Sequence, residues 1–241
     1  AASDPRLVGV QITNANENVG TSMRPRIGVL ALQGDFAEHI QMLDMIGIDS
    51  IEVRKVQQLS EIDGLIIPGG ESTTIVKLLH MFDFVDDLKS HVESGMALWG
   101  TCAGMIVIAR ELADPYPTPL NLIDIGVARN YFGRQVDSFE AELEISGVEG
   151  DPMRAVFIRA PIVQNIGENI EPLATVPATD DHPEQAVAVK SGRVLATSFH
   201  PELTQDTRLH SLFVELAEDA RLDENRADAK RRLTEETAST V

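Results

Sequence analysis

Between residues 27 and 112, short apolar runs alternate with stretches that have helical periodicity. Strands are expected at 27–32, 50–54, 64–68 and 96–100, and helices at 36–46, 73–79, 84–94 and 105–112. Continuous apolar strands that alternate with helices are typical of a parallel sheet covered on both faces. The pattern predicts an α/β fold: a single three-layer domain with a mostly parallel, flavodoxin-like central sheet.

The second half of the chain predicts an antiparallel β extension of that sheet. Shorter β segments are expected at 127–131, 141–145, 155–158 and 170–176, and a hairpin at 185–197 around Ser191-Gly192. A final amphipathic helix places four apolar side chains on one face: Leu209, Leu212, Phe213 and Leu216.

The two ends of the chain lack this regular pattern. Residues 1–23 are interpreted as an N-terminal extension or a cloning remnant, because Met23 would make a sensible native start. After residue 220 a mixed-charge run predicts a frayed or disordered end. We therefore expect one domain over residues 24–220 and a charged C-terminal tail over residues 221–241.

Composition argues against several classes of function. The net charge of -18 disfavours nucleic acid, because binding it depends on Lys and Arg that neutralise phosphates. The acidic excess is interpreted mainly as a solvated surface, with docking onto a basic partner as the alternative. No apolar run approaches the ~20 residues that span a bilayer. A single cysteine fits a reducing compartment, so a cytoplasmic protein is expected.

The only cysteine, Cys102, lies in a Gly-x-Cys-x-Gly turn between an expected strand and an expected helix. Such a turn exposes a nucleophile and leaves little room for side chains beside it, which suits Gly100 and Gly104. The helix N-terminus behind the sulfur favours the reactive thiolate. A lone cysteine is usually a small buried hydrophobe, but the flanking glycines favour a nucleophile.

A cysteine nucleophile needs a base, and the base needs a group that orients it. His200 directly follows an expected strand, and Glu202 lies two residues beyond it. In an extended segment such residues point to the same face, so Glu202 can hold the imidazole in one tautomer and stabilise its cation. Four other histidines, in helical stretches, are interpreted as surface or satisfied core residues: His39, His80, His91 and His210.

A second glycine-rich loop, Pro-Gly-Gly-Glu-Ser-Thr-Thr, follows another expected strand at the same edge of the sheet. Its glycines allow backbone N–H groups to turn toward a ligand, and Ser72 or Thr73 can cap the next helix. An acyl-transfer site usually holds its oxyanion with two donors. We expect Ala103 to supply one N–H and the loop at Gly69 and Gly70 to supply the other.

Four runs together resemble the class I (triad) glutamine amidotransferases: Ala-Leu-Gln-Gly at 31–34, the loop at 68–74, Gly-Thr-Cys-Ala-Gly at 100–104 and Ser-Phe-His-Pro-Glu-Leu at 198–203. Two further runs, at 129–140 and 156–161, are similar to the glutaminase subunit of pyridoxal 5'-phosphate synthase. The resemblance extends from about residue 26 to residue 220.

The resemblance implies an enzyme that hydrolyses L-glutamine to L-glutamate and ammonia. Cys102 would form a γ-glutamyl thioester, with His200 as general base and acid and Glu202 as its orienting group. An arginine can bind the substrate α-carboxylate with two prongs, and an acidic side chain can pair with the α-ammonium. The positions that match the glutamine-binding residues of the family are Gly70, Glu71, Ser72, Arg129, Ile158 and Arg159.

The resemblance also implies a partner. Ammonia would pass to a separate (β/α)8-barrel synthase subunit in a large hetero-oligomer, which combines it with ribose 5-phosphate and glyceraldehyde 3-phosphate to make pyridoxal 5'-phosphate. Such glutaminases are poorly active alone, because the oxyanion-hole peptide near Gly69 and Gly70 reorients on docking. Pyridoxal phosphate is then a product, and neither a cofactor nor a metal is expected.

Three alternatives remain open. One is an amidotransferase that feeds ammonia to a different synthase, and another is a catalytically silent binding subunit. The third is a cysteine peptidase or γ-glutamyl hydrolase, which shares the nucleophile and base but not the run at 129–140. The complete set of Cys102, His200 and Glu202 argues against the silent subunit.

Overall fold

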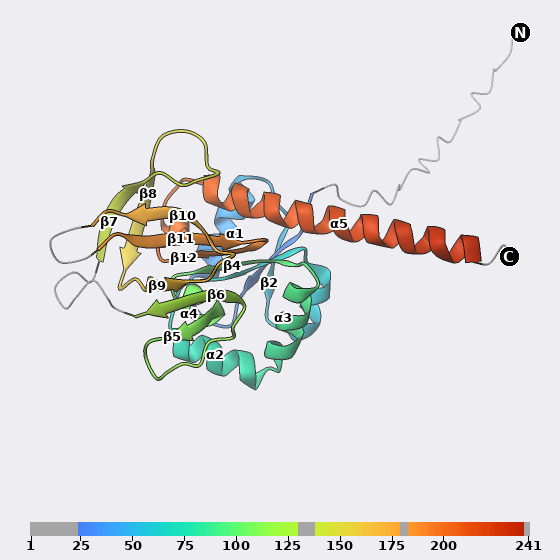
Figure 1. The fold of residues 1–241 in the computed structure, drawn as a ribbon, viewed down its shortest axis with the longest axis horizontal. Helices are drawn as coiled ribbons and strands as arrows, with labels where there is room; N and C mark the ends of the chain where they lie inside the picture. The colour runs from blue at the N-terminus through green and yellow to red at the C-terminus, as the bar shows by residue number, and fades with distance from the viewer. Residues whose placement is uncertain (1–23, 130–137, 179–182, 239–241) are drawn as a thin grey trace, which may run out of the picture.

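The computed structural model describes residues 24–129, 138–178 and 183–238. At its centre lies a seven-stranded sheet with the order β10-β11-β12-β4-β3-β1-β2 (Figure 1). Among the described residues, the strands of this sheet that run parallel to one another are β1 (Ile27–Leu30), β2 (Ser50–Val53), β3 (Gly64–Ile67), β4 (Ala97–Thr101) and β12 (Val194–Thr197). The order 2-1-3-4 followed by a later strand is that of flavodoxin-like sheets. The predicted α/β class is confirmed.

An antiparallel pair extends this sheet at one edge. β11 (Gln185–Ser191) turns through Gly192 and pairs with β12, and β10 (Glu171–Val176) pairs with β11. Both the predicted hairpin and the predicted antiparallel extension are confirmed.

Helices cover both faces of the sheet and bury two apolar clusters against it (Figure 1). On one face lie α2 (Ser72–Met81), α3 (Phe84–Glu93) and α4 (Ala103–Ile108), next to the 3-10 turn η1 (Val56–Glu61). On the other face lie α1 (Phe36–Met45) and the first turns of α5 (Arg208–Ala238). Leu209 and Phe213 of α5 are fully buried, as the amphipathic pattern predicts.

Two smaller sheets complete the fold. One pairs β5 (Ala109–Leu112), β6 (Ile123–Ala128) and β9 (Ile162–Ile166), and the other pairs β7 (Ser138–Leu143) with β8 (Met153–Ile158). The predicted helix at 105–112 is therefore wrong in its second half. The residues of β5 form ladder bonds with β6 instead of continuing α4.

The tail follows the sequence interpretation only in part. α5 is one continuous helix from Arg208 to Ala238 and passes through the boundary expected at residue 220, and its C-terminal half extends beyond the sheet (Figure 1). Residues 1–23 lie outside the described residues. Among the described helices, none is both long and apolar enough to cross a membrane.

The carboxyl ends of four neighbouring strands meet at one edge of the central sheet. The segments that follow β1, β3, β4 and β12 contain Gly34, Gly70, Cys102 and His200, respectively. β4 and β12 are adjacent, with Thr101 in register with Thr197. The sheet therefore brings the cysteine and the histidine together although they are distant in the sequence.

Candidate active site

The elbow at Cys102 connects β4 to α4 with a strained backbone. Cys102 has φ 47° and ψ -104°, a conformation that costs a residue with a side chain about 1–3 kcal/mol. Its N–H donates to the carbonyl of Thr197 at 2.8 Å, which ties the elbow to β12. A Cβ at Gly100 would lie 2.5 Å from the Gly104 carbonyl oxygen, and one at Gly104 would lie 2.0 Å from the Ile67 carbonyl oxygen. The predicted lack of room beside the nucleophile is confirmed.

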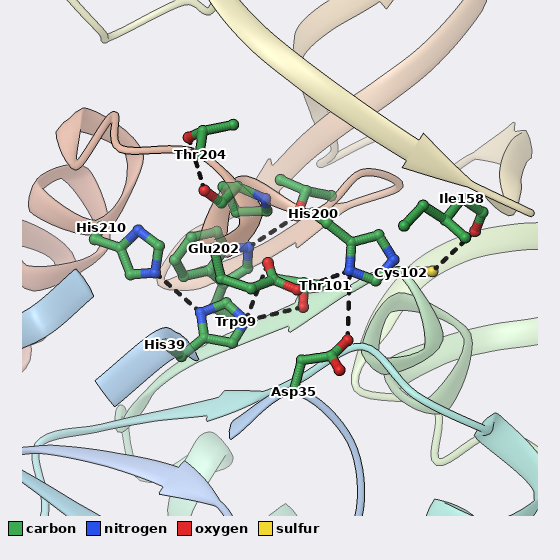
Figure 2. Close-up of polar contacts among 12 residues, drawn as sticks. Asp35, His39, Trp99, Thr101, Cys102, Ile158, His200, Glu202, Thr204 and His210 are labelled. Carbon is green, nitrogen blue, oxygen red and sulfur yellow. Dashed lines mark hydrogen bonds and ion pairs between the residues drawn. The ribbon is translucent and has the colours of Figure 1, made fainter. Parts of the chain in front are cut away.

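His200 and Glu202 form a buried pair next to the elbow. His200 Nδ1 lies 2.7 Å from Glu202 Oε1, and both residues are 5% exposed (Figure 2). The sequence analysis expects this contact to come from an extended segment, and the structure shows that it does not. His200 precedes the 3-10 turn η2 (Pro201–Leu203), which carries Glu202 back toward the imidazole.

The electrostatics of this pair favour an imidazolium. Burial opposes a charge on His200, but hydrogen bonds to Cys102 and Glu202 and their negative charges outweigh it and raise its pKa to about 10. Burial also raises the pKa of Glu202, against the lowering effect of the hydrogen bond from His200. Asp35 Oδ2 approaches His200 Nδ1 to 3.7 Å as a second acidic neighbour. Figure 2 shows the imidazole between the Glu202 carboxylate, to which it is hydrogen-bonded, and the sulfur of Cys102.

We expect His200 to remain doubly protonated at pH 8 in the free protein, and ¹⁵N NMR of histidine-labelled protein measures this directly. A folded-state pKa of about 10 lies above the ordinary value of 6.5. The stability that His200 contributes is therefore complete below pH 6.5 and is lost as the pH rises toward 10. Cys102→Ala should lower this pKa, because one hydrogen bond and one negative charge are lost. A wild-type His200 that titrates near 6.5 would contradict the ion pair.

The sulfur faces a cavity of about 420 Å³. Cys102 Sγ lies 3.9 Å from the Ile158 carbonyl oxygen at its wall. Gly69 packs against the imidazole, since a Cβ there would lie 2.4 Å from His200 Cε1. The predicted site residues that line the cavity are Gly70, Glu71, Ser72, Cys102, Ala103, Arg129, Ile158, Arg159 and His200.

The sequence analysis missed three residues that line this cavity, Gln33, Asp35 and Ile106. Gln33 Oε1 accepts the Glu71 N–H at 2.8 Å and so holds the second glycine-rich loop. A signal for Gln33 was present, because it lies in the Ala-Leu-Gln-Gly run at the end of β1. Asp35 lies in the turn between that run and α1, with no motif of its own.

Glu71 has a structural role that was predicted for other residues. Its carboxylate accepts hydrogen bonds from the N–H groups of Thr73 and Thr74 and so caps α2. Burial raises the pKa of Glu71, but these bonds and the Thr74 hydroxyl outweigh it and lower the pKa. The expectation that Ser72 or Thr73 caps this helix is wrong. Ser72 is the first helical residue and is buried.

The two arginines reach the cavity in different ways. Arg129 Nε lies 3.4 Å from Asp114 Oδ2, and the same carboxylate oxygen accepts its backbone N–H at 3.3 Å. Arg159 has φ 44°, which places a second strained residue at the cavity wall. Residues 130–137 of the run at 129–140 lie outside the described residues.

In the described part of the chain, one group of side chains has a spacing suited to a metal: the ligand atoms of Asp35, His200 and Glu202 lie within 4.8 Å of one another. An imidazolium offers no lone pair to a cation, and His200 Nδ1 is already bound to Glu202. The expectation that the chain needs no metal stays a prediction.

The chain has a flavodoxin-like sheet, a thiol at a strained elbow, and an imidazole held by a buried carboxylate. These features together define the class of α/β enzymes that act through a cysteine nucleophile. The SNO glutamine amidotransferase family model matches residues 29–219. The chain belongs to this family.

Individual relatives agree with the family match. Proteins named pyridoxal 5'-phosphate synthase subunit PdxT, from Rhodococcus jostii and Dehalococcoides mccartyi, are 52% and 53% identical over 196 residues. The matches cover 80% of this chain and 97% and 98% of those proteins. A crystal structure of a glutamine amidotransferase, 49% identical, has a TM-score of 0.73 and covers 79% of this chain and 98% of that one.

Proposed function

We propose that this chain is the glutaminase subunit of a pyridoxal 5'-phosphate synthase, which hydrolyses L-glutamine and delivers ammonia for vitamin B6 synthesis. The observation that carries the proposal is that Cys102 and His200 line the same 420 Å³ cavity, with His200 hydrogen-bonded to the buried Glu202. The name of the family indicates glutamine as the substrate, and the names of the two PdxT relatives indicate pyridoxal 5'-phosphate as the product of the complex.

The geometry supports a two-step reaction. The Cys102 thiolate attacks the side-chain carbonyl carbon of glutamine, and the oxyanion is held by backbone N–H groups of Ala103 and the loop at Gly69 and Gly70. Ala103 begins α4, so its N–H has no acceptor within the helix. The His200 imidazolium gives its proton to the leaving ammonia, and a γ-glutamyl thioester forms. His200 then takes a proton from water, which hydrolyses the thioester to glutamate.

Substrate binding is assigned to other residues that line the cavity. Arg129 binds the α-carboxylate of glutamine, and Ile158 and Arg159 contribute their backbone. The carboxylate of Glu71 already caps α2, so its interaction with the α-ammonium uses an oxygen that also accepts from Thr73 or Thr74. Gly70 and Ser72 line the same cavity.

The partner is proposed to be a (β/α)8-barrel synthase subunit in a large hetero-oligomer, acting on ribose 5-phosphate and glyceraldehyde 3-phosphate. Docking would reorient the peptide at Gly69 and Gly70. In the free chain the Gly69 carbonyl accepts the Asp35 N–H at 3.0 Å, so turning that peptide breaks this bond. A small local cost of this kind suits a site that is switched on by its partner. The cytoplasmic location stays a prediction.

Mixing this chain with the barrel synthase is expected to raise glutamine hydrolysis at least about fivefold, the lower end of ordinary coupling between sites. Ammonia release is measured with and without the synthase at saturating glutamine. An unrelated (β/α)8-barrel protein is the control. A rate that is high and independent of the synthase would favour an independent hydrolase. No activity in either condition would favour the silent binding subunit.

A further inference from the structure

A line of buried polar side chains continues behind the catalytic pair. His39 of α1 and His210 of α5 are both fully buried, and His39 Nδ1 lies 2.9 Å from His210 Nε2. On its other side, His39 Nε2 lies 3.2 Å from Thr101 Oγ1 and 3.4 Å from Glu202 Oε2 (Figure 2). The interpretation of His39 and His210 as satisfied core residues therefore omits a contact with the group that orients His200.

Both imidazoles are neutral at physiological pH. Burial lowers the pKa of His210 to about 3. Burial and the neighbouring His210 and His200 lower the pKa of His39 well below its ordinary value. A neutral imidazole has one N–H and one bare nitrogen, so the hydrogen bond between the two rings allows two arrangements of protons.

The surroundings distinguish these arrangements. Among the described residues, His210 Nδ1 and Glu202 Oε2 are buried and have no hydrogen-bond partner, although His39 Nε2 lies 3.4 Å from Glu202 Oε2. If His39 donated from Nδ1, its bare Nε2 would face the Glu202 carboxylate, and His210 would bury an unpaired N–H. If His210 donates from Nε2 instead, its unpaired Nδ1 is a bare nitrogen, and the His39 proton sits on Nε2, directed at Glu202 and Thr101. The second arrangement directs an N–H, and not a lone pair, at the carboxylate oxygen 3.4 Å from His39 Nε2.

We propose that His39 is a positioning residue that donates its Nε2 proton toward Glu202 Oε2, in the tautomer set by His210, and so keeps Oε1 directed at His200. This inference rests on the proposed function, because its effect is measured on glutamine hydrolysis. Among the described residues, the ionisable side chains that face this carboxyl group are His200, His39 and Asp35. Of these, His39 approaches Oε2, with Nε2 at 3.4 Å.

The assignment has a consequence for the pH dependence. Glu202 is buried, and desolvation favours its neutral form. A donor at Oε2 favours the charged form, and the charged form is the one that stabilises the His200 imidazolium. Without His39, Glu202 would protonate at higher pH, and the acid limb of the activity profile would move upward.

The test uses the full chain together with the barrel synthase and compares three variants. His39→Phe keeps a ring but has no donor, and we expect kcat to fall about 10–100-fold, as for a lost hydrogen bond to a charged group. KM for glutamine should change little, and the acid limb should move to higher pH. His39→Gln places an amide donor near the Nε2 position and should recover most of kcat and the pH profile. Leu43→Ala, on the same buried face of α1, should lower Tm without moving the profile.

A kcat and profile of His39→Phe equal to the wild type would overturn the proposal, as would an equal profile shift in Leu43→Ala. If the wild type itself releases no ammonia with the synthase, the proposed function fails. The tautomer can still be read from the wild type by ¹⁵N NMR, also if His39→Phe does not fold. A proton on His39 Nε2 supports the inference, and a proton on Nδ1 refutes it.

Discussion

Replacing Cys102 with alanine is expected to abolish glutamine-dependent ammonia release, with a loss of about 10³-fold or more. The sequence holds no second cysteine that could take over as the nucleophile. Alanine also has a Cβ, so the positive φ of the elbow is strained to a similar extent in both proteins. The variant should therefore fold, and the loss reports on chemistry. A coupled assay that detects ammonia measures it in the presence of the synthase.

Binding to the synthase should survive this change, because Cys102 is only 8% exposed. Sedimentation of the variant with the barrel subunit provides the control, and Cys102→Ser tests whether a hydroxyl can replace the sulfur. Ammonia release at the wild-type rate in Cys102→Ala would remove the sulfur from the mechanism. Loss of binding together with activity would show that the elbow also shapes the docking surface.

The placement of Cys102 and His200 could be predicted from the sequence because the relevant signals are local. Each residue follows a short apolar strand, and glycines or a proline fix the turn beside it. In a parallel sheet the carboxyl ends of all strands lie at one edge, so the two side chains meet without any knowledge of distant contacts. The same rule located Gly70.

Features decided by tertiary contacts could not be predicted in this way. Ala109–Leu112 follows α4 with no glycine or proline between them, and its strand conformation goes with its ladder pairing to β6. Glu71 is an unusual cap beside Ser72 and Thr73, which are the more common cap types.

The burial of His39 has a local signal in the sequence. Met42 and Leu43 lie three and four residues after it, which places all three on one face of α1, and that face is buried. A histidine on such a face needs polar partners in the core. Which partners it finds depends on α5 and η2, far along the chain, and no periodicity within α1 encodes them.

Gly104→Ala is expected to destabilise the protein by more than about 3 kcal/mol, a loss typical of a severe steric clash. The added Cβ would lie 2.0 Å from the Ile67 carbonyl oxygen and 2.9 Å from its carbonyl carbon. Both atoms belong to the backbone of β3, which is held between β1 and β4 in the centre of the sheet. No side-chain rotation relieves this contact, so α4 or β3 must move. Urea unfolding followed by far-UV circular dichroism measures the loss.

Gly192→Ala is the matched control, because a Cβ there meets no atom within 4 Å. Its φ of +55° makes alanine unfavourable by only about 1–2 kcal/mol. If Gly104→Ala costs no more than Gly192→Ala, the close approach of α4 to β3 is not what requires glycine at the elbow. If the difference is as large as expected, the close approach of Gly104 to Ile67 fixes the start of α4. It then also fixes the positions of the Ala103 N–H and the Cys102 sulfur. Stability and catalysis at this elbow then both depend on the absence of a Cβ at Gly104.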